Sequence, residues 1–235
     1  MINDKYRHEL KYIVSDTQIK ILENRIRNYM QVDQHTVDGS YNVRSLYFDD
    51  YSNSCYYQNE NGTDPREKYR IRIYNCSKDR ISLECKRKEN GKTFKKICPL
   101  SYEQFLCIVN GKPLNNFDSM DPLLRIFTVK MITDLFKPTI IVDYIRKPYI
   151  YQSGNVRVTF DTMISSSGCF DRFFDQDMPK RPIMPSGMQL LEVKYDEFIP
   201  DDIYNNLQVE DLNRTAYSKY YLCRKFEMGG QHVTV

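Results

Sequence analysis

Charged and apolar side chains alternate along five short segments of this 235-residue chain. In residues 69–73, Arg70 and Arg72 alternate with isoleucines. Successive side chains of a β-strand point to opposite faces, so each such segment has one apolar face and one ionic face. An ordinary sheet with one face in water also alternates, but these polar rows are mainly Arg, Lys and Glu. The other four rows are Glu9 with Lys11, Ser82 with Glu84, Lys86 and Lys88, Arg157 with Thr159, and Glu192 with Lys194.

The chemistry that suits such rows is the binding of a chain of phosphates. Arg grips phosphate oxygens in two-point contacts, and Lys acts as a mobile point charge. Carboxylates repel phosphate unless a divalent cation lies between them, and Mg²⁺ or Mn²⁺ is commonly held by one or two carboxylates together with phosphate oxygens. We therefore predict that Glu192 holds a Mn²⁺ or Mg²⁺ ion. Glu9 and Glu84 are further candidates, although each could instead pair with a neighbouring Lys or Arg.

Four helices are predicted around the strands. Ser15 with Gln18, and Ser101 with Gln104, form capping-box patterns that begin the first two. Pro122 begins the third, because proline suits a first helical turn. The fourth is expected within residues 212–226.

Eight strand-like runs accompany these helices, and residues 165–189, which contain three prolines, read as a loop. The helices need an apolar surface to cover, so the ionic faces of the strands are left pointing at each other. We predict one α+β domain over residues 1–235, a closed antiparallel β tunnel barrel with amphipathic helices packed outside. The strand-like runs are 6–14, 43–48, 68–74, 81–88, 93–98, 139–146, 155–161 and 190–195.

The bulk composition narrows the classes of partner and site. A net charge of only +3 disfavours a nucleic-acid-binding barrel, so no nucleic-acid partner is expected. Seven cysteines without a CxxC pair and three histidines disfavour a zinc cluster. No apolar stretch reaches the roughly 20 residues that span a bilayer. We therefore expect a cytoplasmic protein, and the oligomeric state is not readable from the sequence.

The ordered set of motifs resembles the VTC domain of polyphosphate polymerases, within the triphosphate tunnel (CYTH-like) superfamily. Each motif alone is weak, but together they follow the order of the family from residue 6 to residue 221. The matching segments are 7–12 (RHELKY), 43–49 (VRSLYFD), 68–74 (KYRIRIY), 83–86 (LECK), 144–146 (YIR), 157–161 (RVTFD), 191–195 (LEVKY) and 218–220 (SKY).

This resemblance implies transfer of the γ-phosphate of ATP to a growing inorganic polyphosphate chain, with release of ADP and with Mn²⁺ or Mg²⁺ in the tunnel. It also implies that a membrane protein on another chain could receive the product. Glu192 would hold the metal. Contact with the transferring phosphate is implied for Arg70, Arg72, Lys86, Arg157 and Lys219. Substrate binding is implied for Lys11, Arg44, Lys96, Arg146, Lys194 and Ser218, with the choice between Lys96 and Lys95 left open.

The sequence departs from the superfamily pattern at one position that bears on the choice between polymerase and hydrolase. Hydrolytic members of the superfamily begin with two glutamates in an ExExK pattern, but Arg7 occupies the first of these positions and leaves only Glu9 before Lys11. This favours the polymerase. A metal-dependent tri- or polyphosphatase, and a non-catalytic module that binds polyphosphate or inositol pyrophosphate, remain as alternatives.

Overall fold

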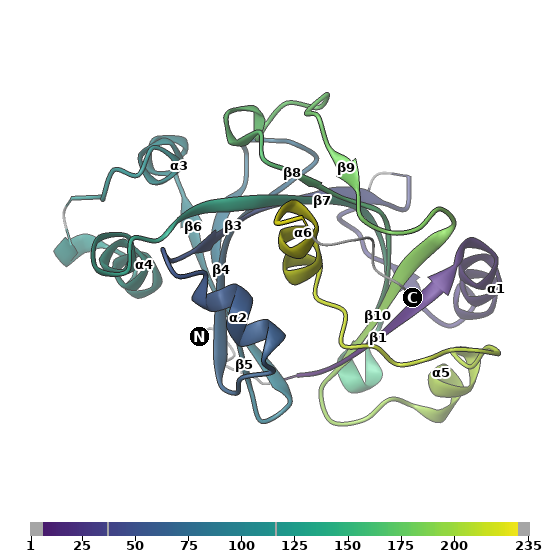
Figure 1. Cartoon of the computed structure of the whole chain (residues 1–235). Coiled ribbons are helices and arrows are strands. Elements are labelled where there is room, and N and C mark those ends of the chain that lie inside the picture. The colour runs from purple at the N-terminus through teal and green to yellow at the C-terminus, as the bar shows by residue number, and fades with distance from the viewer. Residues whose placement is uncertain (1–6, 37, 116, 230–235) are drawn as a thin grey trace.

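One antiparallel sheet curls into a half-barrel, seen end-on in Figure 1. This computed structural model describes residues 7–36, 38–115 and 117–229. The strand order is β1-β10-β8-β7-β3-β4-β5-β6, with β2 paired to β7 and β9 to β8. The strands are β1 (His8–Ser15), β2 (Gln31–Val32), β3 (Tyr41–Asp49), β4 (Arg66–Tyr74), β5 (Ile81–Glu89), β6 (Lys92–Leu100), β7 (Lys137–Tyr151), β8 (Val156–Ser167), β9 (Arg181–Pro182) and β10 (Met188–Tyr195).

Within the described residues, the two edges of this sheet are hydrogen-bonded through one bridge, between Arg7, just before β1, and Thr93 of β6. Arg7 and Thr93 exchange two backbone hydrogen bonds, with N···O distances of 3.1 and 3.2 Å. A barrel closed by a continuous ladder would pair the two edges along their length. The structure therefore shows an open half-barrel with touching edges, where the sequence predicted a closed barrel.

The two faces of the sheet differ as the alternation predicts. Ile71, Ile73 and Leu83 are fully buried on the convex face and belong to the larger of two apolar clusters. The smaller cluster joins Leu22 of the first helix to Leu191 and other residues of β8 and β10. Burial of these convex side chains holds the helices α1, α3 and α4 outside the sheet (Figure 1). The charged rows are left on the concave face.

Helix starts follow the signals in the sequence. Ser15 with Gln18, and Ser101 with Gln104, form complete capping boxes at the starts of α1 and α3, and Asp121 caps α4 just before Pro122. The helices are α1 (Asp16–Ile26), α2 (Ser54–Glu60), α3 (Tyr102–Val109), α4 (Pro122–Thr133), α5 (Asp201–Asn206) and α6 (Lys219–Glu227), with 3₁₀ turns η1 (Phe117–Ser119), η2 (Ser153–Asn155) and η3 (Phe170–Arg172).

The C-terminal region differs most from its prediction. The last helix begins at Lys219 rather than near residue 212, because the preceding segment runs extended beside β1, where the Thr215 amide donates to the Lys11 carbonyl at 2.8 Å. In addition, α6 does not pack outside the sheet. Its Tyr220 ring packs on Tyr47 of β3, and Figure 1 shows the helix over the concave side. The sequence did not predict α2 or α5.

Residues 165–189 form a loop only in part. Strand β8 continues to Ser167, and β9 adds a short pairing to it before β10 begins at Met188. Within the described residues, no helix is both long enough and apolar enough to cross a bilayer.

Candidate functional site

A cavity of about 510 Å³ opens on the concave face of the sheet. We call it the basic cavity, because its lining holds eleven Lys and Arg side chains against two carboxylates, Glu9 and Glu192. A lining with this excess of cations suits an anionic ligand from outside the chain. The basic lining residues are Lys11, Arg66, Lys68, Arg70, Arg72, Lys86, Lys88, Arg146, Lys194, Arg214 and Lys219.

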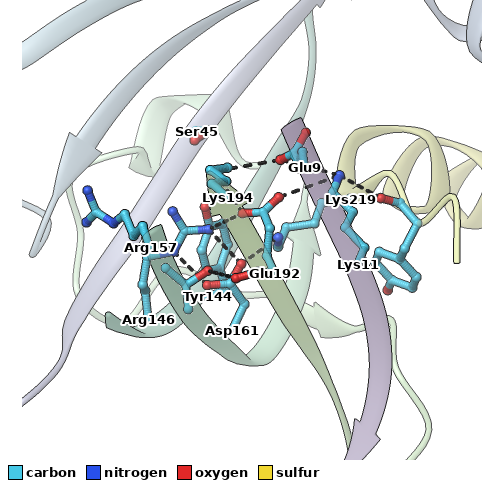
Figure 2. A network of polar contacts seen from close by, with 12 residues as sticks. Glu9, Lys11, Ser45, Tyr144, Arg146, Arg157, Asp161, Glu192, Lys194 and Lys219 are labelled. Carbon is cyan, nitrogen blue, oxygen red and sulfur yellow. Dashed lines mark hydrogen bonds and ion pairs between the residues drawn. The ribbon is translucent and has the colours of Figure 1, made fainter. Parts of the chain in front are cut away.

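Glu192 lies at the centre of the charged network drawn in Figure 2. Its carboxylate pairs with Lys194 at 3.0 Å, Arg146 at 3.2 Å and Lys11 at 3.6 Å. Burial alone would raise the pKa of Glu192, but Lys194 and Lys219 outweigh it and hold the pKa well below its ordinary value. Glu192 is therefore an anion that gathers cations from three strands.

A second carboxylate, Asp161, holds the side chains of Arg146 and Lys219 in place. It is fully buried and accepts two hydrogen bonds from Arg146, at 2.6 and 2.7 Å, while Lys219 Nζ lies 2.6 Å from its Oδ2 (Figure 2). Burial would lower the pKa of Lys219, but Asp161 and Glu192 reverse this and raise it. Sequence reasoning missed Asp161, although it shares the ionic row of Arg157 and Thr159 and the strand alternation identifies it.

Glu9 provides the observation that bears most directly on a metal ion. Its Oε2 accepts from Lys86 at 2.7 Å, but its buried Oε1 accepts no hydrogen bond, and the nearest cations are Lys194 at 3.6 Å and Lys11 at 3.9 Å. Both of these lysines also pair with Glu192, so the two carboxylates are neighbours. An unsatisfied carboxylate oxygen beside a second carboxylate fits a divalent cation. No group of three His, Cys, Asp or Glu gathers within the described residues, so phosphate oxygens would complete its coordination.

Glu84, the third predicted metal ligand, lies outside the lining of the basic cavity. It accepts from Arg70 at 2.6 and 2.8 Å and from Lys95 at 3.2 Å, which occupies both of its oxygens. Burial opposes its ionisation, but Arg70, Arg72 and Lys95 hold its pKa well below the ordinary value. Glu84 therefore holds Arg70 and Arg72 in position. With both oxygens occupied, it is not a candidate metal ligand, which corrects the prediction.

The two arginines of β4 are held in fixed orientations. Arg70 donates to the Tyr47 hydroxyl at 2.8 Å, and Arg72 donates to Ser45 Oγ at 3.0 Å and to the Tyr144 hydroxyl at 3.2 Å. These contacts leave further N–H groups of both guanidinium groups for a ligand in the cavity.

Lys68 also lines the basic cavity, and sequence reasoning did not select it. Its Nζ donates to Ser218 Oγ at 2.9 Å and to Asn59, and within the described residues no carboxylate pairs with it. Burial, with repulsion from Lys11 and Lys86, lowers its pKa well below the ordinary value. Lys68 shares the row of Arg70 and Arg72, so the strand alternation identifies it too.

The register of β6 decides between Lys95 and Lys96. The Asn90-Gly91 turn has both residues at positive φ, which is typical of a two-residue hairpin, so Glu89 pairs with Lys92 and Lys86 with Lys95. Lys95 therefore points inward, where it bonds Glu84. The exposed Lys96 points outward over the Phe94 ring, and the prediction that it binds substrate is not supported by its position.

Arg44 is another residue that the structure does not bring to the cavity. It lies on the convex face of β3, because its neighbour Ser45 contacts inward-facing Arg72. Its buried side chain pairs with Asp143 at 2.7 Å and donates to the carbonyl of Phe173. Arg44 therefore anchors the loop after β8. Its position on the convex face corrects the prediction that it binds substrate.

Arg157 lies in a different cavity. Its guanidinium group pairs with Asp33 at 2.8 Å and donates to the Tyr41 hydroxyl at 2.9 Å, and Figure 2 shows it pointing away from Glu192. This second cavity measures about 1060 Å³ and carries four tyrosines, so we call it the tyrosine cavity. The structure thus separates Arg157 from Arg70, Arg72, Lys86 and Lys219, with which the sequence grouped it.

Asp49 positions the helix that carries Lys219 and Ser218. This buried carboxylate accepts from the backbone amides of Cys55 and Tyr56 in α2, and from the Tyr220 hydroxyl of α6 at 2.6 Å. The end of β3 therefore holds both α6 and α2, and Asn59 of α2 also lines the basic cavity. Ser218 caps α6, and its hydroxyl also receives the Lys68 hydrogen bond.

The model of the VTC domain matches residues 6–227, nearly the whole of the chain. This chain belongs to the VTC domain family. A comparison with curated protein sequences gives no significant match. Among solved structures, the VTC chain is similar to a protein from Hippeastrum described as a candidate adenylyl cyclase with a dominant triphosphatase activity. They share 13% identity at a TM-score of 0.52, over 96% of this chain and 97% of that one.

A candidate adenylate cyclase from Vibrio parahaemolyticus has a TM-score of 0.51 at 10% identity, over 94% of the VTC chain and 98% of its own. At these identities the likeness establishes the fold alone. It confirms an α+β architecture with a curled antiparallel sheet and helices outside it.

Proposed function

We propose that this VTC domain is a polyphosphate polymerase, which transfers the γ-phosphate of ATP to the end of an inorganic polyphosphate chain. The observation that carries the proposal is the lining of the basic cavity, with eleven cations against two carboxylates and a half-buried Lys68 that pairs with no described carboxylate. A cavity of this kind suits a highly charged chain of phosphates.

In the proposed reaction a terminal oxygen of polyphosphate attacks the γ-phosphorus of ATP. The bond from this phosphorus to the β–γ bridging oxygen breaks, and ADP leaves with the electron pair. Phosphoryl transfer passes through a loose transition state, so catalysis depends on alignment and charge stabilisation. No side-chain nucleophile is required. Arg70 and Arg72, fixed by their tyrosine and serine contacts, would stabilise the equatorial oxygens from one side, and Lys219 would do so from the other.

A Mn²⁺ or Mg²⁺ ion held by Glu9 and Glu192 would neutralise charge on the bound phosphates. The unsatisfied Glu9 Oε1 supports this assignment. Glu84 is not part of it. Lys11, Lys86, Lys194, Arg146 and Ser218 would bind the remaining phosphates. Closure of the half-barrel into a tunnel around the ligand is part of the same proposal, supported by the Arg7–Thr93 bridge and by the extended segment before α6 beside β1.

A metal-dependent tri- or polyphosphatase is the second candidate. The same unsatisfied Glu9 oxygen supports it, because it could also accept a hydrogen bond from an attacking water. Against it stands Arg7, which occupies the position of a second glutamate and pairs instead with Asp196 at 3.0 Å.

The two candidates differ in their products. Purified protein is incubated with ATP and Mn²⁺ or Mg²⁺, and the products are resolved by chain length. A polymerase yields ADP and a ladder of polyphosphates, whereas a phosphatase yields orthophosphate without chains. Binding of polyphosphate without turnover of ATP would leave only a binding module.

Variants assign the activity to the basic cavity. We expect Arg72→Ala and Lys219→Ala each to lower chain synthesis about 100-fold or more, the range for loss of one charge-stabilising donor. Lys96→Ala, which removes an outward-facing lysine of β6, is the matched control and keeps full activity. Full activity in both inward variants would refute the assignment.

A further inference from the structure

The tyrosine cavity differs in chemistry from the basic cavity. Beside its four tyrosines, its lining includes four side-chain amides and only three cations against two carboxylates. A polyphosphate chain has no counterpart for this lining, which lacks the excess of positive charge found in the basic cavity. The four tyrosines are Tyr29, Tyr41, Tyr74 and Tyr151, and the amides are Gln31, Gln34, Asn75 and Gln152.

The two cavities adjoin along the concave face. Strand pairing sets Arg146 of the basic cavity opposite Tyr41 of the tyrosine cavity, and Lys194 opposite Arg157. Along β4, Tyr74 follows Arg72 in the same row. Residues opposite each other in a ladder lie about 5 Å apart, so one ligand can reach from one cavity into the other.

The tyrosine cavity has the groups that recognise a heteroaromatic ring. The rings of Tyr41 and Tyr74 meet edge to face with centroids 5.6 Å apart, and Tyr29 keeps 51% of its surface exposed. Aromatic faces stack with nucleobases. Amide side chains both donate and accept hydrogen bonds, which the edges of bases also do. A volume of about 1060 Å³ is ample for a nucleoside.

We propose that the tyrosine cavity binds the nucleoside part of a nucleoside triphosphate whose phosphates lie in the basic cavity. Arg157, held by Asp33 and Tyr41, stands at the junction, where the phosphate nearest the nucleoside would pass. The inference rests on the proposed function and deepens it, because it names the residues that distinguish a nucleotide donor from bare polyphosphate.

The test compares two ligands by calorimetric titration without divalent metal. They are β,γ-imido-ATP, which resists transfer, and tripolyphosphate, which has no nucleoside. The variants are Tyr29→Ala and Tyr74→Ala. Tyr51→Ala is the matched control, because Tyr51 is 76% exposed and lies outside both cavities. We expect the wild type to bind the nucleotide more tightly, and Tyr29→Ala and Tyr74→Ala each to weaken nucleotide binding about fivefold or more while leaving tripolyphosphate binding unchanged.

Equal binding of the two ligands by the wild type, with no effect of either substitution, would overturn the inference and leave phosphate binding in the basic cavity intact. Weaker binding of long polyphosphate in the tyrosine variants, with nucleotide binding unchanged, would also overturn it and make this cavity a path for the product. Failure of the wild type to bind either ligand would instead refute the proposed function itself. Tyr29 is half exposed, so Tyr29→Ala reports on binding even if Tyr74→Ala fails to fold.

Discussion

The inward-facing lysines differ in how they are compensated, and their protonation differs accordingly. Asp161 and Glu192 raise the pKa of Lys219, whereas burial lowers the pKa of Lys86 to about 8 despite its contact with Glu9. Burial also lowers the pKa of Lys95 to about 8, despite Glu84. Lys86 is therefore a group whose charge a bound anion would restore.

The lowered pKa of Lys86 predicts that ligand binding is coupled to proton uptake. A polyanion in the basic cavity raises the pKa of Lys86, so binding of tripolyphosphate near pH 8 should take up protons. Calorimetry at pH 8 in buffers of different ionisation enthalpy measures the uptake. Lys86→Arg should reduce it, because arginine stays charged at this pH, while Lys96→Arg should not. Heats that do not depend on the buffer would contradict the prediction.

The same pKa shift has a consequence for stability. The unfolded chain keeps Lys86 protonated up to about pH 10.4, whereas the folded protein releases the proton near pH 8. Between these values the unfolded state binds more protons, so the contribution of Lys86 to stability rises with pH across this window.

Substitutions of Lys68 and Arg44 should distinguish a cation that binds ligand from a cation that stabilises the fold. Lys68→Met removes a half-buried cation that no described carboxylate compensates, so the free energy of unfolding should stay the same or rise, while tripolyphosphate affinity falls about tenfold. Arg44→Met leaves Asp143 with less compensation and should cost about 3–5 kcal/mol of stability without changing affinity. Denaturant unfolding and calorimetry measure both quantities. A reversal between the two variants would mean that the faces of the sheet are wrongly assigned.

Glu9 and Glu192 should differ as metal ligands. Glu9→Gln removes a carboxylate with one unsatisfied oxygen, so it should raise the half-saturating Mn²⁺ concentration about tenfold or more with little loss of stability. Glu192→Gln should raise it too, and should also destabilise the fold, because three cations lose their shared anion. The readout is a Mn²⁺ titration of activity beside thermal unfolding. An unchanged titration in either variant removes that residue from the metal site.

At the scale of elements, one carboxylate of β3, Asp49, accepts hydrogen bonds from both α2 and α6. Tyr220→Phe deletes the hydroxyl that donates to buried Asp49, and should cost about 1–3 kcal/mol and weaken tripolyphosphate binding, because α6 carries Lys219. Tyr221→Phe is the matched control, since its hydroxyl reaches Glu60 at an exposed site. Equal effects of the two substitutions would show that Asp49 does not position α6.

Strand periodicity alone was sufficient to predict which face of the sheet is charged. The capping signals at Ser15, Ser101 and Pro122 set three helix starts. The same row rule applied to β3 places Arg44 with Leu46 and Phe48 on the apolar face, and the Asn90-Gly91 turn selects Lys95 over Lys96, so both placements could have been predicted from the sequence. The late start of α6 was not, because the segment before it is held by hydrogen bonding to β1, a contact between residues about 200 apart in sequence.

Binding of a polyanion to the cations of the basic cavity should stabilise the whole folded protein. Tripolyphosphate at about 100 times its Kd should stabilise the protein by about 2.7 kcal/mol. For a chain of this size that corresponds to a rise in Tm of roughly 5–10 °C. Sodium chloride at equal ionic strength is the control and should give a much smaller rise, because it screens charge without bridging the cations. Equal shifts from salt and from tripolyphosphate would argue against a specific site.

The pairing of β1 with β10 constrains the order in which the molecule can be assembled. Strand β1 emerges from the ribosome long before its ladder partner, which begins at Met188. At about 5–20 residues per second, β1 waits roughly 10–40 s for that partner. Throughout this interval Glu9 and Lys11 lie on a strand without its ladder partner, so the metal-binding part of the site cannot form until β10 has been made, and Lys219 of α6 follows later still. Nascent chains halted before residue 188 should therefore hold the arginines of β4 in native pairing while β1 remains open to proteases and chaperones.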